Sequence, residues 1–390
     1  MEVLNMRKKL KKVAAIALSC LMAAGVMTGC GSSKAGIGTK TNDGNKVLFQ
    51  YDGEKVTLKE GWLYAKLIAA QYESTYSSTY GKDFWKMDMG RDNKGKEQTF
   101  ESYTKQQIIS QLKQQIVLNK KADAYGCKLS AADKKKCTES ALSYYQSSNG
   151  RTVMDECGLL REDVEEFYKE ILLASKVKDK IKSQANATVT EDEARKSTVY
   201  RVVFPTTMTK DGMVQLMNKK EEASVKRKAQ KALKEIQSGK KTIKKIAKEQ
   251  GYTNTDESYA AGESEEGKSF EKEMKKLKDG DLCSKVLKCD NGYVIAKLVA
   301  YTDKKETASN KKVLKEEKES KYFQKVYEKW TKKLDKKWSY EKNVDQKLWK
   351  QVKLNDADDF SEATTELKKQ TKNETTEKQK TKSITHRLDL

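Results

Sequence analysis

Residues 199–205 read VYRVVFP. At this β-branched run the predicted secondary structure changes from helices alone to a mixture of strands and helices. Clustered Val residues favour a strand, and Pro205 ends it. The following sequence predicts three helices and then two strands. The expected helices span 219–237, 242–250 and 270–277, and the strands lie on either side of a turn at 290–292, with the last at 293–301. Residues 199–302 therefore predict a compact α+β domain.

The sequence before this domain predicts helices that each carry one apolar face. A short hairpin turns at Asp52 and Gly53, and Thr57 with Glu60 forms a capping box that begins the first helix. Further helices are expected to end at Gly126, to span 130–145 and 162–183, and to follow a second capping box at Thr190 and Glu193. We expect irregular chain at 72–98 and between Gly150 and Gly158. Residues 46–198 thus predict an N-terminal helical domain.

The composition agrees with a mainly α protein that contains an inserted α+β domain. The chain has one proline, where average composition gives about 20. Phe323, Tyr327, Trp330, Leu334 and Trp338 recur at helical spacing, so 303–356 predicts a C-terminal helix that returns to the helical domain. Apolar residues become rare after that, and we expect 357–390 to be a disordered tail.

The N-terminus has the pattern of an export signal. Five basic residues precede an apolar run from Val13 to Met27, which is too short to span a membrane. Thr28 and Gly29 before Cys30 resemble a bacterial lipobox, so residues 1–29 predict a lipoprotein signal peptide and Cys30 the site of lipid attachment. The alternative is an ordinary cleaved signal. Residues 30–45 then predict a flexible tether, and the protein is expected on the outer face of the cytoplasmic membrane.

The charge points to solvated helix faces. The net charge of +22 falls by four to +18 without residues 1–29, and Lys and Glu alternate along many helices. Export argues against nucleic acid as a partner, whereas the excess positive charge favours anionic cell-wall polymers or acidic lipids. The sequence predicts no cofactor and no metal, because its only histidine, His386, lies in the polar tail and no phosphate-binding loop is present. Cys127 and Cys137 flank a turn and could pair, but free buried thiols are favoured.

The order of these parts resembles the PrsA and SurA family of extracytoplasmic foldases, over residues 46 to about 355. Three sequence segments carry the resemblance. They are the turn and capped helix at 52–60, the helix ending in Ala124-Tyr125-Gly126, and Gly158-Leu159 before the helix at 162–180. The inserted domain resembles a parvulin (PpiC-type) prolyl isomerase. Its most specific phrases are LKDGDL at 277–282 and NGYVIAKL at 291–298.

The resemblance implies a peptide-binding cleft, with Phe270 lining a proline pocket. The cleft residues that it implies are Arg201, Phe270, Leu277, Tyr293 and Val294. Active parvulins carry a His in the first strand and another in the last, where this sequence has Arg201 and Val294. Asp256 falls in the loop where the family places an acidic or thiol group, and is either catalytic or a turn residue. Glu266 or Gly267 replaces the pocket Met, and Arg201 is expected to point its charge into the cleft.

These features predict a membrane-anchored, ATP-independent chaperone that holds unfolded exported proteins in an apolar cradle of the helical domain, with a degenerate isomerase domain. The alternative is an active peptidyl-prolyl cis-trans isomerase that uses Asp256. A cell-wall or solute-binding lipoprotein is less favoured, because the chain lacks the alternating strands and helices of two α/β lobes.

Overall fold

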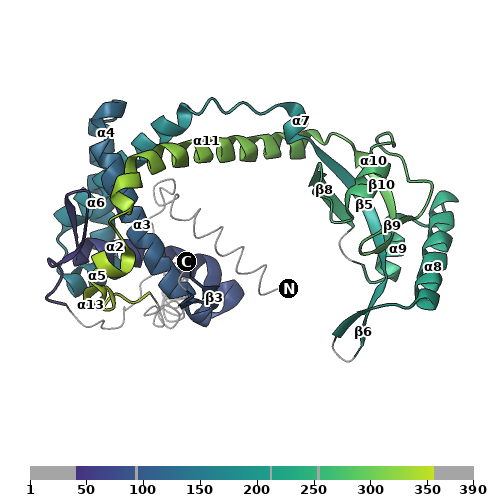
Figure 1. The fold of residues 1–390 in the computed structure, drawn as a ribbon, viewed down its shortest axis with the longest axis horizontal. Helices are drawn as coiled ribbons and strands as arrows, with labels where there is room; N and C mark the ends of the chain where they lie inside the picture. The colour runs from purple at the N-terminus through teal and green to yellow at the C-terminus, as the bar shows by residue number, and fades with distance from the viewer. Residues whose placement is uncertain (1–40, 93–94, 211–212, 253–254, 355–390) are drawn as a thin grey trace, which may run out of the picture. The chain divides into compact units, whose positions relative to one another are not determined.

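The computed structural model describes residues 41–92, 95–210, 213–252 and 255–354, which form two compact units (Figure 1). Unit 1 comprises the described parts of Met1–Gln184 and Phe323–Leu390, and unit 2 comprises those of Ala185–Tyr322. Helix α11, Lys304–Asp335, belongs to unit 2 at its start and to unit 1 from Phe323. The predicted signal peptide, Cys30 and the predicted tail from 357 lie outside the described residues. Among the described residues, no helix has the length and apolar character needed to cross a membrane.

Unit 1 is mainly helical. Its elements are β1 (Val47–Tyr51), β2 (Glu54–Thr57), α2 (Leu58–Tyr80), η1 (Lys82–Lys86), β3 (Asp88–Arg91), β4 (Glu97–Thr99), α3 (Phe100–Lys120), η2 (Asp123–Tyr125), α4 (Ala131–Gln146), α5 (Ser148–Cys157), α6 (Arg161–Ser183), the end of α11, α12 (Tyr340–Asn343) and α13 (Gln346–Trp349). The predicted capping box at Thr57 is formed, since the Glu60 carboxylate accepts from the Thr57 backbone N–H at 2.5 Å. These helices pack their apolar faces into one core.

The C-terminal segment of unit 1 packs against this core. The Trp338 ring lies 6.3 Å from the Phe49 ring and 5.9 Å from the Tyr51 ring, both edge-on. Trp349 is buried, and the ammonium group of Lys105 on α3 donates to its carbonyl oxygen at 2.7 Å. The closing residues therefore complete the core that β1 and α3 begin.

Three expectations for unit 1 were wrong in detail. The stretch 72–98 is not irregular, because α2 continues to Tyr80 and is followed by η1 and the β3–β4 hairpin. The stretch from Gly150 to Gly158 contains α5, whose N-cap is Ser147. The described chain already contacts unit 1 before Lys46: the Thr41 N–H donates to the Glu156 carbonyl at 2.9 Å. The flexible tether that we expected at 30–45 therefore does not include Thr41, and the residues before 41 lie outside the described ranges.

Unit 2 is an α+β unit built on a four-stranded sheet. Its elements before α11 are α7 (Glu191–Ala194), β5 (Lys196–Pro205), β6 (Thr207–Lys210), β7 (Met213–Leu216), α8 (Lys219–Gln237), α9 (Ile243–Glu249), β8 (Asp256–Ala260), α10 (Lys268–Met274), β9 (Leu287–Cys289) and β10 (Gly292–Ala300). The sheet order is β8-β5-β10-β9, and every neighbouring pair is antiparallel. The mainly α class with an α+β domain is thus confirmed.

The two faces of the sheet carry separate apolar cores, since side chains alternate along a strand. One core joins Val202 and Ile295 to α8 and α9. The other joins Val203 and Val294 to Phe270 of α10. The sequence did not predict β8 or the β6–β7 hairpin. β8 and β6 consist largely of polar residues, whereas β7 reads MVQL with Val214 and Leu216 exposed. These strands gain backbone hydrogen bonds from partners that local patterning does not reveal.

Candidate functional site

The face of the sheet under α10 carries the residues at the expected isomerase site. β5 and β10 pair so that Arg201 lies opposite Ala296 and Val203 lies opposite Val294. Arg201 and Val294 therefore point to the same face. Phe270 belongs to the same apolar core, with Leu277 partly buried against it. The structure thus brings together four of the five predicted cleft residues.

Tyr293 is the exception. It is the neighbour of Val294 along β10, so its side chain lies on the other face, in the core with α8 and α9. Its hydroxyl group lies 3.0 Å from a carboxylate oxygen of Glu222 on α8. The expectation that Tyr293 lines the cleft was therefore wrong, because the two-residue alternation of a strand separates it from Val294.

Arg201 does not carry a free charge into a cleft, as we had expected, but is enclosed by carboxylates. Its side chain is 1% exposed, and Nε lies 2.8 Å from Oε1 of Glu266, which is also 1% exposed. Nη2 lies 2.6 Å from Oε2 of Glu265, and Nε lies 3.2 Å from Oε2 of Glu257. We call Arg201, Glu257, Glu265 and Glu266 the Arg201 cluster. Its guanidinium group is directed at the protein itself.

The electrostatics of the cluster depend on burial and pairing. Burial raises the pKa of Glu266, and the ion pair with Arg201 opposes that shift. Burial acts against the charge of Arg201, but hydrogen bonds to Glu265 and Glu266 outweigh it and raise the pKa. Arg201 Nη1 and Glu266 Oε2 are buried without a hydrogen-bond partner. A buried pair of this kind becomes costly when one partner is removed, since the other charge stays buried.

Asp256 lies apart from this cluster. It is the first residue of β8, opposite Tyr200, and not a loop residue as we had expected. Its side chain is exposed, and because Glu257 faces Arg201, Asp256 points to the opposite face of the strand. The sequence had also missed Glu257 and Glu265 as partners of Arg201. The acidic run at 263–266 was the available signal for Glu265.

The pocket residues Phe270 and Val294 are covered in this structure. They are 1% and 0% exposed, and the Phe270 ring lies 6.3 Å from the Tyr259 ring. The five described cysteines are free, with Cys127 partly exposed and the others buried. Within the described ranges no group of three His, Cys, Asp or Glu residues is suited to a metal ion. The site thus consists of a closed apolar layer next to an ion cluster.

Comparisons with known proteins identify this unit. Residues 206–300 match the model of the rotamase family, the PPIC-type PPIase domain. No curated protein matches the chain. The chain is similar to the peptidylprolyl isomerase PrsA from Bacillus cereus, with 19% identity over 69% of this chain and 100% of that one, at a TM-score of 0.28. The foldase PrsA from Streptococcus pneumoniae shares 18% identity over 67% of this chain and 98% of its own, at 0.27. PrsA from Bacillus subtilis shares 20% identity over 68% of this chain and 98% of its own, at a TM-score of 0.20. Residues 206–300 are a PPIC-type PPIase domain, which confirms the predicted parvulin-type domain.

Proposed function

We propose that this protein is an extracytoplasmic foldase, anchored through a lipid on Cys30, that holds unfolded exported proteins and whose PPIC-type domain does not catalyse prolyl isomerisation efficiently. The family match of residues 206–300 supports a role in protein folding. The signal-like N-terminus, with Thr28 and Gly29 before Cys30, supports export and anchoring. Its partners are then segments of unfolded chains, and its positive charge favours a position near anionic wall polymers or lipids.

The Arg201 cluster is the observation that carries the proposal of weak catalysis. Isomerisation requires a site that lowers a barrier of about 18–20 kcal/mol by polar groups preorganised around the prolyl amide. In this chain the first-strand position holds Arg201, whose Nε and Nη2 are occupied by Glu266 and Glu265. The last-strand position holds the apolar Val294. No imidazole is present there to orient a central group, and the apolar layer is covered.

A rescue variant tests this reading. Arg201→His with Val294→His restores both imidazoles, and Glu266→Met must accompany them, because the buried carboxylate would otherwise pair with the imidazole introduced on β5. We expect the triple variant to accelerate prolyl exchange in a tetrapeptide and the wild type not to. A matched control, Arg201→Met with Glu266→Met, removes the cluster without adding histidines and should stay inactive. Equal activity of control and rescue variants would refute the role assigned to the histidines.

Holding activity is assigned to unit 1. Leu142 and Tyr145 lie three residues apart on α4 and are 39% and 43% exposed, so they place apolar groups on one face of the helix, with the Arg151 guanidinium group 5.4 Å from the centre of the Tyr145 ring. Such a surface suits contact with unfolded chains. The full chain should suppress aggregation of a denatured test protein. Leu142→Glu with Tyr145→Glu should weaken suppression, whereas Ser143→Glu with Gln146→Glu, which adds the same charge on the same helix, should not. Equal loss in both would contradict the assignment.

An active isomerase that uses Asp256 is the second candidate, favoured by the family match itself. The Asp256 side chain is exposed and lies on the face opposite Glu257. It therefore does not share a site with Phe270 or Val294. Asp256→Ala separates the two candidates, because only the second expects it to lower the rate of prolyl exchange.

A further inference from the structure

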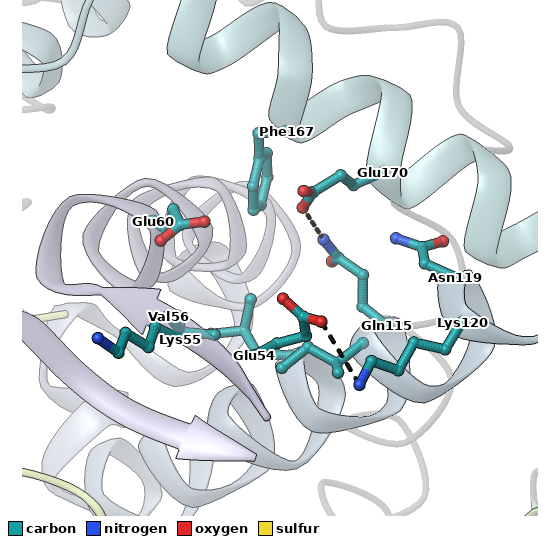
Figure 2. Close-up of a pocket in the computed structure, with 11 residues that line it drawn as sticks. Glu54, Lys55, Val56, Glu60, Gln115, Asn119, Lys120, Phe167 and Glu170 are labelled. Atoms are coloured by element: carbon teal, nitrogen blue, oxygen red, sulfur yellow. Dashed lines mark hydrogen bonds and ion pairs between the residues drawn. The ribbon is translucent and has the colours of Figure 1, made fainter. Parts of the chain in front are cut away.

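A depression in unit 1 lies between β2, α2, α3 and α6 (Figure 2). Its volume is about 260 Å³, slightly below the range of pockets that enclose a drug-sized ligand, so it suits a single side chain. Val56, Leu112, Ile116 and Phe167 supply apolar walls. Figure 2 shows the Gln115 side chain of α3 directed at the carboxylate of Glu170 of α6, and both line the depression.

Glu170 is unusual because it is partly buried and lacks a cation. Its Oε2 accepts from the Gln115 amide at 2.8 Å, which is its one hydrogen bond to the described residues, and it forms no ion pair with any of them. Buried carboxylates are normally paired with a positive group. Gln115 is neutral and 9% exposed, so it orients the carboxylate without neutralising it.

The other charged groups around the depression are engaged elsewhere or are also acidic. Glu60 accepts from the Thr57 N–H as part of the α2 cap, and Lys120 lies 3.4 Å from both Asp52 and Glu54. The titratable groups that line the depression besides Glu170 are Glu54 and Lys55 of β2, Glu60 of α2 and Lys120 of α3, and Glu166 of α6 acts on Glu170 from the same helix. Burial raises the pKa of Glu170 to about 7, and Glu60 adds to the shift by repulsion. A ligand cation paired with the carboxylate would oppose both effects, because an opposite charge favours the ionised form.

We propose that this depression is a subsite for the cationic side chain of a lysine or arginine in an extended client segment. The aliphatic stem would lie against Leu112, Ile116 and Phe167, and the cationic end would pair with Glu170. This inference rests on the proposed holding function and adds to it a preference for basic client segments.

Peptide binding to the full chain tests the subsite. The probe is a nine-residue Gly-Ser peptide with blocked ends and a central lysine, and matched peptides carry arginine or the uncharged norleucine. At pH 8 we expect the lysine and arginine peptides to bind more tightly than the norleucine peptide. Since a group of pKa about 7 is ionised about ten times less at pH 6 than at pH 8, affinity should fall about tenfold at pH 6.

Glu170→Gln should lower affinity for both cationic peptides and abolish the pH dependence. Glu162→Gln, at an exposed position on the same helix, serves as the matched control and should retain both. Equal binding of the norleucine and lysine peptides, or pH dependence that persists in Glu170→Gln, would overturn the proposal. If the wild-type chain suppresses aggregation but one of these two binding results is found, the subsite is refuted and the holding function stands. Loss of suppression in the wild type would instead refute the holding function.

Discussion

Replacing Arg201 with Met should destabilise unit 2 by about 3–5 kcal/mol, because it leaves Glu266 buried without its cation. The size of the effect follows from burial: Arg201 and Glu266 are both 1% exposed and lie 2.8 Å apart. Glu265 is 66% exposed, so its contact with Arg201 contributes less than about 1 kcal/mol. Glu265→Gln is therefore the matched control, with a small expected loss.

The double variant Arg201→Met with Glu266→Met should recover most of the loss, because it replaces a buried ion pair by apolar side chains. The lost stability is not recovered in full, because Glu257 also loses its contact with Arg201. Glu257 Oε1 still accepts from Ser264 and from the Glu265 N–H. The single variant should also regain stability at low pH. Burial raises the pKa of Glu266, so protonation removes its unpaired charge as the pH falls.

The distribution of tryptophan allows the two units to be measured separately. All five tryptophans lie in unit 1, at 62, 85, 330, 338 and 349, so fluorescence in urea reports on unit 1 alone. Hydrogen exchange of the β5 and β10 amides reports on unit 2. We expect Arg201→Met to accelerate exchange in β5 and β10 by about 100-fold or more and to leave the fluorescence transition unchanged. Exchange that changes less than about fivefold, with no coupling between positions 201 and 266, would refute the role of the buried pair.

Three further predictions concern unit 1 and the N-terminus. In urea unfolding, Glu170→Gln should stabilise the chain by up to about 3 kcal/mol at pH 8 and have no effect at pH 4. The reason is that the raised pKa of Glu170 in the folded state costs stability as the pH rises from about 4.5 through 7. Equal effects at both pH values would contradict this. Lys105→Met removes the donor to the carbonyls of Trp349 and Val352 and should cost about 1–3 kcal/mol in the fluorescence transition, and no change would show that α13 is held without it. Metabolic labelling with a palmitate analogue should mark the wild type and not Cys30→Ala, and label on the variant would refute the lipid anchor.

The sequence predicted elements well where local signals and burial agree. Val199 to Pro205 carries β-branched residues and a terminating proline, and β5 includes that run. The capping boxes at Ser130 and Thr190 mark helix starts because their hydroxyl oxygens accept from the N–H groups of Asp133 and Glu193 in the first turn. At Thr57 the Glu60 carboxylate accepts from the Thr57 backbone N–H instead. Parts without such signals were missed. α2 runs on to Tyr80 because Tyr72 and Tyr76 are buried among Phe84, Trp85 and Phe100, a contact set that depends on residues distant in sequence.

The candidate site was predicted in composition but not in geometry. The resemblance places Arg201 and Val294 where active parvulins carry histidines, and the pairing of β5 with β10 puts both on the same face of the sheet. The neutralisation of Arg201 depends on Glu257 from β8 and on Glu265 and Glu266 from the loop before α10. Only tertiary structure brings these segments together. Glu170 gave no sequence signal either, because an acidic residue within a Lys- and Glu-rich helix resembles any solvated position.

Exchange NMR of a proline tetrapeptide with the wild-type chain tests the central claim most directly. Uncatalysed prolyl exchange takes tens to hundreds of seconds, so even weak catalysis is measurable. With Arg201 bound by Glu265 and Glu266 and with Val294 in place of a histidine, we predict that the exchange rate equals that of the peptide alone. Acceleration by the wild type that disappears in Asp256→Ala would contradict the account and establish an active isomerase.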